Sequence, residues 1–456
     1  MLSLDDIIKG VGSELREVRG ASEGCSVKRV VIDSRDVTPG AMFVALRGER
    51  SDGHEYITSA IEQGAVAVIA ERAPEVPIVA ATAALLLVGD SLAALQALAA
   101  YWRSQHAAEV IGITGSVGKT TTKELTAAVL SRRSEVLKNP GNLNNEIGLP
   151  LTLLQLEEQH ALVVLEMGMY ALGEIKRLCD IARPRVGVVT NVGPSHLERL
   201  GSIERIAEAK AELVLSLPPE GVAVLNGDDE RVRAMAGQTG AKVSLYGVKT
   251  GVDLSAESVE SRGLDGIQFR LRRGERSSDV RLPLLGRHSV YTALAAAAVA
   301  LEEGLSWEET VAGLEEPETP IRLVVLPGLK RTTIIDDTYN ASPSSAEAAL
   351  GVLGEVDARR IAVLGDMLEL GEFEEEGHRE VGRRAAACAD VIIATGERGR
   401  IIGEEAQRAG MTKVYFADSA VGAAAWLDRL VREGDVVLVK GSRGMAMEKI
   451  VEGIAK

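Results

Sequence analysis

Hydrophobic and polar positions follow different periods along the chain and divide it into three regions. The first region, residues 1–108, holds short strand-like apolar runs between Pro-Gly and Asp-Gly turn signals: 30–32, 42–46 and 65–70. The second region alternates apolar runs with helical patterns, the runs being 110–114, 161–165, 186–190 and 222–226. Runs that are apolar on both faces and separated by helices predict a parallel sheet covered on both sides.

The rest of the chain predicts two further units. Residues 254–285 carry short alternating strands, and a helix over 291–301 leads out of this segment. Beyond a proline-flanked connector near residue 317, a second doubly wound α/β unit is predicted from five apolar runs: 332–335, 360–364, 391–394, 413–416 and 436–439. We therefore expect an α/β protein of three domains, with boundaries at 1–108, 109–315 and 316–456.

Composition and charge exclude several classes of protein. The 456 residues carry a formal charge of −15, which argues against electrostatic binding to nucleic acid or to an anionic membrane. The three cysteines are far apart and form no metal-ligand spacing, which is typical of a reducing compartment. The N-terminus lacks the order of a signal peptide, and no apolar run reaches membrane-spanning length. A soluble cytoplasmic protein without stable membrane insertion is expected.

A glycine-rich turn joins the apolar run at 110–114 to a polar helical pattern. Residues 112–123 read GITGSVGKTTTK. Glycines allow backbone N–H groups to surround phosphate oxygens, Lys119 adds a charge, and Thr120 offers a hydroxyl to magnesium. Ile113 stands where the common phosphate-loop pattern has its first glycine, so the strict spacing fails. The strand before the turn and the helix after it still predict nucleotide binding.

Polar residues follow the next two apolar runs of the second region. Glu166 ends the run at 161–165 and is well placed to hold Mg²⁺, with a helix-capping or surface role as the alternative. His196 falls past the end of the run at 186–190, where ligands bind in open α/β sheets. Lys210 lies in a helical pattern and by default is a surface lysine. Asn142 belongs to a cluster with Asn144 and Asn145 that serves either turn chemistry or a ligand.

Two clusters follow strands of the third region. Residues 336–340 (DDTYN) combine acids and an aromatic that suit a ribose and a base, although a capped helix start explains the following Ser342 and Pro343 equally well. Residues 440–444 (KGSRG) place two cations and two glycines at a helix start. This cluster is either an anion site or a basic turn.

Together these segments resemble the Mur ligase family, the ATP-dependent amide-bond ligases that build the peptide of the bacterial cell-wall precursor. The resemblance covers the whole chain and is most specific at 336–343, 364–371 and 440–445. Those segments are similar to the member that joins D-alanyl-D-alanine to UDP-N-acetylmuramoyl-tripeptide. The Asp-Asn-Pro-Arg segment of the ligase that adds a diamino acid to the UDP-dipeptide is absent from the sequence. That ligase is the alternative; a P-loop NTPase that acts as a switch and a bare UDP-sugar-binding protein are more distant rivals.

The resemblance implies three domains: an N-terminal one for the UDP-sugar, a central ATPase and a C-terminal Rossmann-like domain that closes over the nucleotide. It implies ATP and two Mg²⁺ ions, with an acyl phosphate as intermediate and a monomer as the working form. Lys119, His196 and Lys210 are the implied catalytic residues, Lys210 matching a lysine that several relatives carry as a carbamate. The implied metal ligands are Thr120, Glu166, His196 and Lys210.

The resemblance also implies contacts to nucleotide and substrate. The ATP contacts are Gly115, Ser116, Val117, Gly118, Lys119, Thr120, Thr121, Asn142, Arg322, Asp337 and Tyr339. The substrate contacts are Ser34, Arg35, Asp52, His54, Asn340, Lys440 and Arg443. One segment departs from the family pattern: residues 286–292 read GRHSVYT, with Ser289 and Thr292 in place of two asparagines. An adenine contact usually made there is therefore either lost or made by other residues.

Overall fold

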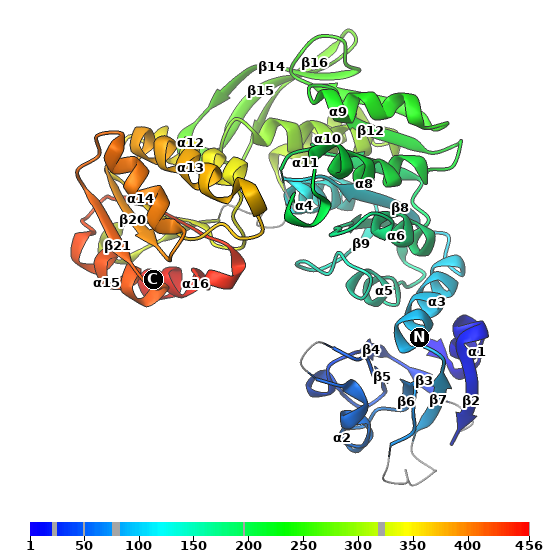
Figure 1. The fold of residues 1–456 in the computed structure, drawn as a ribbon. Coiled ribbons are helices and arrows are strands. Elements are labelled where there is room, and N and C mark those ends of the chain that lie inside the picture. The colour runs from blue at the N-terminus through cyan, green and yellow to red at the C-terminus, as the bar shows by residue number, and fades with distance from the viewer. Residues whose placement is uncertain (21–24, 49–50, 75–82, 195–196, 318–323, 456) are drawn as a thin grey trace.

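The computed structural model describes residues 1–456 except 21–24, 49–50, 75–82, 195–196, 318–323 and 456. Figure 1 shows three lobes that follow one another in chain order, each built around its own sheet. The lobes are mixed α/β with mostly parallel strands, which confirms the fold class predicted from the apolar runs.

The N-terminal lobe is built on a five-stranded sheet of order β2-β7-β6-β5-β4. Its strands are parallel except for β2, which pairs antiparallel with β7. A short antiparallel pair, β1 with β3, lies beside it. The elements are β1 (Leu2–Ser3), α1 (Leu4–Val11), β2 (Leu15–Arg19), β3 (Ser26–Val27), β4 (Arg29–Val31), β5 (Ala41–Val44), α2 (Ile57–Glu62), β6 (Ala67–Ala70), β7 (Ala84–Val88) and α3 (Ser91–Ser104).

The central lobe carries a nine-stranded sheet of order β16-β15-β14-β13-β12-β11-β8-β10-β9. Strands β8 to β14 run parallel, β15 pairs antiparallel with β14, and β16 pairs antiparallel with β15. The strands are β8 (Glu109–Thr114), β9 (Glu135–Lys138), β10 (His160–Glu166), β11 (Val186–Val189), β12 (Val222–Asn226), β13 (Lys242–Gly247), β14 (Leu254–Ser261), β15 (Ile267–Arg273) and β16 (Arg276–Leu282). The helices are α4 (Lys119–Ser131), α5 (Gly148–Leu153), α6 (Glu174–Ala182), α7 (Leu197–Leu200), α8 (Ile203–Leu215), α9 (Glu230–Ala234), α10 (Ser289–Glu302) and α11 (Trp307–Glu315).

Successive residues of the central strands enter two different cores. Val163 and Leu165 of β10 pack with α3, α5, α6 and α8, whereas Leu162 and Val164 pack with α4, α10 and α11. Side chains alternate between the two faces of a strand, so a strand buried on both sides must be apolar throughout. This is why the apolar runs that form β8, β10, β11 and β12 can be recognised in the sequence.

The C-terminal lobe holds a six-stranded sheet of order β17-β18-β22-β19-β20-β21, parallel except for β17. The strands are β17 (Val324–Pro327), β18 (Thr333–Asp337), β19 (Arg360–Leu364), β20 (Val391–Thr395), β21 (Val414–Ala417) and β22 (Val436–Lys440). The helices are α12 (Pro343–Gly354), α13 (Glu374–Cys388), α14 (Gly399–Arg408), α15 (Ala420–Leu430) and α16 (Glu448–Ile454). The five strands predicted for this region correspond to β18, β19, β20, β21 and β22.

Helix α3 connects the first two lobes. It lies between the N-terminal sheet and the central lobe in Figure 1, and its buried residues belong to one core that continues from β5–β7 into β8 and β10. The two cores on either side of the C-terminal sheet are distinct from that one, and one of them also takes in Leu285 of the central lobe. None of the helices in the described part of the chain combines the length and apolar character that a membrane span requires.

Candidate functional site

A phosphate-loop conformation follows β8. The strand ends at Thr114, residues 115–118 turn, and α4 begins at Lys119. Gly115 and Gly118 have φ of +150° and +85°, which side-chain-bearing residues rarely adopt. A Cβ on Gly115 would lie 1.9 Å from Oγ1 of Thr190, whereas one on Gly118 would meet nothing within 4 Å. The glycines are therefore required by backbone shape, and at Gly115 by the close approach of β11's end as well.

Residues that follow β11 hold the loop in shape. The Ser116 hydroxyl donates to the Gly193 carbonyl at 2.9 Å, and the Val117 N–H donates to Oδ1 of Asn191 at 2.9 Å. The Lys119 ammonium donates to the Gly115 carbonyl at 2.7 Å, so it lies across the mouth of the loop. These neighbours fix the backbone of the loop in the shape that anion-binding loops adopt, with the N–H groups of Ser116 and Val117 both donating to Asn191.

Glu166 is brought to this loop by strand pairing. Strands β8 and β10 are adjacent and parallel, with Glu166 in register with Ile113, so both carboxyl ends meet at one edge. The Thr120 hydroxyl donates to Oε2 of Glu166 at 2.7 Å, and the Asn144 amide donates to Oε1 at 2.7 Å. The carboxylate is buried, with 3% of the residue exposed. A hydroxyl and a carboxylate beside a phosphate loop are the oxygen donors that Mg²⁺ prefers.

These two ligands fit a magnesium ion that completes its shell with phosphate oxygens and water. Within the described ranges, no group of three or more histidine, cysteine or acidic side chains could hold a metal by itself. A site that relies on bound phosphate needs no such group, because one or two carboxylates suffice. The donor set therefore suits Mg²⁺ bound together with a nucleotide.

In the asparagine cluster, Asn144 is the residue whose side chain contacts Glu166. Asn142 is exposed, and its carbonyl accepts the Asn144 N–H at 2.7 Å. Asn139 was not singled out from the sequence, yet it is fully buried and its side chain bonds both the N–H and the carbonyl of Glu166, at 2.9 and 3.1 Å. The cluster of asparagines indicated that this loop could be functional. The spacing alone does not show which asparagine contacts Glu166.

Lys210 is buried, which contradicts its default interpretation as a surface lysine. Only 2% of the residue is exposed, because it lies on the face of α8 that also buries Ile206 and Leu213. No described residue forms a hydrogen bond or an ion pair with its amine. Burial lowers the pKa of Lys210 well below its usual value, and the charge of Lys119 lowers it further. The sequence signal was the spacing of residues 206, 210 and 213, which puts the lysine on the apolar stripe.

His196 and Arg322 lie outside the described residues, so their predicted roles stay predictions. In the segment that departs from the family pattern, the Ser289 hydroxyl donates to the Leu285 carbonyl at 2.7 Å. Ser289 and Thr292 are both buried in α10. The hydroxyl of Ser289 therefore bonds the backbone that precedes α10.

The predicted nucleoside and substrate residues of the C-terminal lobe come together at one sheet edge. Parallel strands β18 and β22 pair Asp337 with Lys440, and the Lys440 ammonium donates to Asp337 at 2.5 Å and to the Asn340 carbonyl at 2.8 Å. The Arg443 guanidinium lies over the Tyr339 ring at 5.6 Å. Ser342 and Pro343 form the capped start of α12, as the capping interpretation required. An acid, an aromatic ring and cations thus share one edge.

The predicted residues of the N-terminal lobe form two local networks. Asp33 caps the turn that contains Ser34 and pairs with the exposed Arg35 at 2.5 Å. Asp52 accepts from the ring of His54 at 2.6 Å and from Arg72 at 2.8 Å. The Glu71 N–H donates to Nε2 of His54 at 2.9 Å, so the ring carries its proton on Nδ1. Both ring nitrogens of His54 are therefore used inside the lobe.

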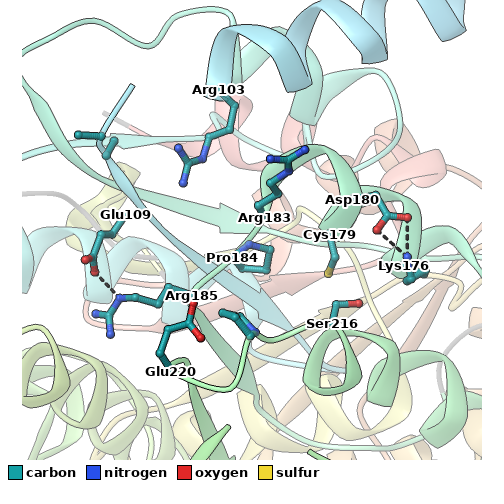
Figure 2. A pocket seen from close by; sticks show the side chains of 13 residues that line it. Arg103, Glu109, Lys176, Cys179, Asp180, Arg183, Pro184, Arg185, Ser216 and Glu220 are labelled. Carbon is teal, nitrogen blue, oxygen red and sulfur yellow. Dashed lines mark hydrogen bonds and ion pairs between the residues drawn. The ribbon is translucent and has the colours of Figure 1, made fainter. Parts of the chain in front are cut away.

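A cavity of about 710 Å³ opens at the opposite edge of the central sheet, where β8 and β11 begin (Figure 2). Its charged groups are mostly bonded to each other or to backbone. Lys176 pairs with Asp180 at 2.5 Å, Arg185 pairs with Glu109, and Arg103 donates to the Ala182 carbonyl at 3.0 Å. None of the predicted site residues lines it, so the phosphate-loop edge is the candidate site.

Three family models match the chain. The Mur ligase middle domain matches residues 113–300, the Mur ligase glutamate ligase domain matches 321–443, and the Mur ligase family catalytic domain matches 26–103. Together they cover most of the sequence.

Individual relatives match over nearly the full length. The chain is 38% identical over 436 residues to the UDP-N-acetylmuramoyl-tripeptide–D-alanyl-D-alanine ligase of Bacillus subtilis, a match that covers 93% of this chain and 92% of the relative. The crystal structure of MurF from Acinetobacter baumannii is 35% identical, with a TM-score of 0.84 and 93% of each chain covered. MurF from Thermotoga maritima, solved in complex with ADP, is 32% identical with a TM-score of 0.81, covering 95% of this chain and 98% of that one.

Proposed function

The chain belongs to the Mur ligase family, and we propose that it joins D-alanyl-D-alanine to UDP-N-acetylmuramoyl-tripeptide with conversion of ATP to ADP and phosphate. The full-length similarity to ligases of that name supports the choice of substrates. The observation that carries the reaction type is the contact of Thr120 with Glu166 beside the phosphate loop. The product is UDP-N-acetylmuramoyl-pentapeptide, the precursor of peptidoglycan.

The reaction has to activate a carboxylate, which is a poor electrophile at neutral pH. An oxygen of the tripeptide carboxylate attacks the γ-phosphorus of ATP, the bond to the β-phosphate oxygen breaks, and ADP leaves. The amine of D-alanyl-D-alanine then attacks the acyl carbon, loses a proton and expels phosphate. The chain's task in the first step is to position the two reactants and neutralise the charge between them.

Residues 115–121 surround the β- and γ-phosphates in this proposal. Gly115, Ser116, Val117 and Gly118 form the cradle together with the hydroxyl of Thr121, with Asn142 at its rim. The N–H groups of Ser116 and Val117 donate to Asn191 in this structure and would exchange that partner for phosphate oxygens. Lys119 moves from the Gly115 carbonyl to the phosphates, exchanging one acceptor for a charged one. Thr120 and Glu166 hold one Mg²⁺ ion, and His196 with Lys210 holds a second. When bound, the ions supply neutralisation of phosphate charge.

Lys210 carries a carbamate in the proposed active form. The support is its environment: burial lowers the pKa of the amine and so favours its neutral form, which has the lone pair that attacks carbon dioxide. A C–N bond forms and a proton leaves, so a buried base becomes a carboxylate-like metal ligand. Lys210→Met should therefore lose activity, and added bicarbonate should not restore it.

The remaining predicted residues bind the outer parts of the substrates. Asp337 and Tyr339 contact the nucleoside, with Arg322 on the phosphates. Asn340, Lys440 and Arg443 lie at the same sheet edge and contact the peptide substrates. In the N-terminal lobe, Ser34, Arg35, Asp52 and His54 form the UDP-sugar site; the exposed guanidinium of Arg35 is the side chain most able to reach a ligand.

The lobes correspond to domains 1–108, 109–315 and 316–456 in this proposal. The first binds the UDP-sugar, the second ATP, and the third closes over the nucleotide. The working form is a monomer in the cytoplasm, where all three small-molecule substrates meet.

Product analysis separates this function from its rivals. The enzyme is supplied with ATP and either UDP-N-acetylmuramoyl-tripeptide plus D-alanyl-D-alanine, or UDP-dipeptide plus a diamino acid, and products are identified by mass. The proposal requires a UDP-pentapeptide from the first pair alone. A UDP-tripeptide from the second pair would assign the chain to the related ligase instead.

A further inference from the structure

Lys123 is a lysine with no exposed surface, one turn beyond Lys119 on α4. An ammonium group has three N–H donors, and each has a partner here. Its Nζ lies 2.6 Å from the Asn139 carbonyl, 3.4 Å from the Gly141 carbonyl and 3.0 Å from Oε1 of Glu124. Burying such a charge is costly unless it is fully bonded, so this position calls for more than a helix-forming residue.

The two carbonyls belong to the loop that leads from β9 to α5. The Asn139 side chain in this loop clamps the backbone of Glu166, and the Asn144 amide bonds the Glu166 carboxylate. The Asn144 carbonyl also accepts the Gly168 N–H at 2.8 Å, just past the end of β10. Lys123 therefore anchors the start of the loop whose later residue orients the acid.

We propose that Lys123 is a positioning residue for the metal-binding carboxylate, acting through the backbone of residues 139–141 and through Asn144. The inference rests on the proposed function, in which Glu166 holds Mg²⁺ with Thr120. Lys123 orients one oxygen of Glu166 toward Asn144 and leaves the other directed at Thr120. Groups that orient metal ligands typically change metal affinity by 10- to 100-fold when removed.

The experiment compares Lys123→Met, Lys123→Gln and the matched control Lys138→Met. Lys138 pairs with the same Glu124 carboxylate but does not bond the loop carbonyls. Mn²⁺ binding to the enzyme–ADP complex is followed by electron paramagnetic resonance, and folding by thermal unfolding. Lys123→Met should weaken Mn²⁺ binding about tenfold. Lys138→Met should change it less than twofold.

Lys123→Gln keeps N–H donors without the charge and should fall between Lys123→Met and the native chain. If Lys123→Met does not fold, the Mn²⁺ binding of Lys123→Gln is compared with that of the native chain instead. Catalysis supplies a second readout: kcat at low Mg²⁺ should fall and recover partly at high Mg²⁺, whereas KM for D-alanyl-D-alanine should stay within twofold.

A double-mutant cycle with Asn144→Leu tests whether Lys123 acts on Glu166 through Asn144. If Lys123 acts through Asn144, the double variant binds Mn²⁺ about as weakly as the weaker single variant. Additive losses, or unchanged Mn²⁺ binding in a folded Lys123→Met, would overturn the proposal and leave Lys123 as a structural residue. Because Mn²⁺ binding with ADP needs no peptide substrate, the result is independent of whether the UDP-pentapeptide is made.

Discussion

Lys119 supplies the one formal positive charge within residues 115–121. In the first step, negative charge builds up between the γ-phosphate and the attacking carboxylate, so removing this cation should cost on the order of 10²–10³ in turnover. The measurement is steady-state phosphate release by Lys119→Ala with all three substrates present.

The matched control is Lys176→Ala, which removes an exposed cation paired with Asp180 on α6. It should retain near-normal turnover. Thermal unfolding should show both variants folded. Near-normal turnover by a folded Lys119→Ala would mean that charge neutralisation at the loop has been assigned to the wrong group.

Individual site residues differ in how far the sequence identifies them. Lys119, Thr120 and Glu166 follow from a strand, a turn and a helix in order, because strand ends converge in parallel sheets. Lys210 was named through the family resemblance alone, and its burial was not predicted because a lysine is seldom buried. Asn139 was missed because its partners are backbone groups 27 residues away in the chain.

Alanine at the two glycines of the loop between β8 and α4 should reduce stability by different amounts. Gly118→Ala meets open space and pays only for a left-handed φ, about 1–2 kcal/mol of stability. Gly115→Ala adds an overlap with Thr190 to an unfavourable φ, so its cost should be on the order of 3 kcal/mol or more. Urea unfolding of the two variants measures the difference; equal losses would show that the approach of β11 is not tight.

Glu303, at the end of α10, is predicted to make the stability of the fold depend on pH. Burial raises the pKa of the Glu303 carboxyl to about 7, against the lowering effect of Arg185, and the nearby Glu109 carboxylate raises it further. Between pH 4.5 and 7 the unfolded chain binds fewer protons at this group than the folded chain. Stability contributed by this group is therefore present below pH 4.5 and lost as pH rises to 7.

Glu303→Gln removes this titration, so its stability relative to the native chain should rise between pH 5 and pH 8. Urea unfolding at several pH values measures the change. Glu302→Gln is the control: it lies next in the chain and pairs with Lys242 and Arg273 instead. Parallel pH profiles for the two variants would contradict the assignment to Glu303.

Strands buried on both faces were predictable, whereas the edge strands β9 and β17 were not. The runs for β10, β11, β12 and β22 place apolar residues on both faces of the strand, because helices cover both sides. Strands β9 and β17 lie at sheet edges, are short and are partly exposed, so their sequences carry no clear period. Their existence depends on the neighbouring strand that they pair with.

The distribution of hydrophobic cores predicts which lobes move together. The core shared through α3 joins the N-terminal and central lobes, whereas the cores of the C-terminal lobe take in only Leu285 of the central lobe, with Leu264 packed against it. An acyl phosphate must be kept from water, so we expect the C-terminal lobe to close over the bound substrates. Small-angle scattering should show compaction with a non-hydrolysable ATP analogue and UDP-tripeptide together. An unchanged radius of gyration would count against closure.

For the molecule as a whole, transfer of oxygen from substrate to phosphate is the most direct test of ligation through an acyl phosphate. UDP-N-acetylmuramoyl-tripeptide labelled with ¹⁸O in its terminal carboxylate is incubated with ATP and D-alanyl-D-alanine, and phosphate and nucleotide products are analysed by mass. We expect one ¹⁸O in each released phosphate and one UDP-pentapeptide for each phosphate. Unlabelled phosphate, released at the same rate without the dipeptide, would show a nucleotide hydrolase and contradict this expectation.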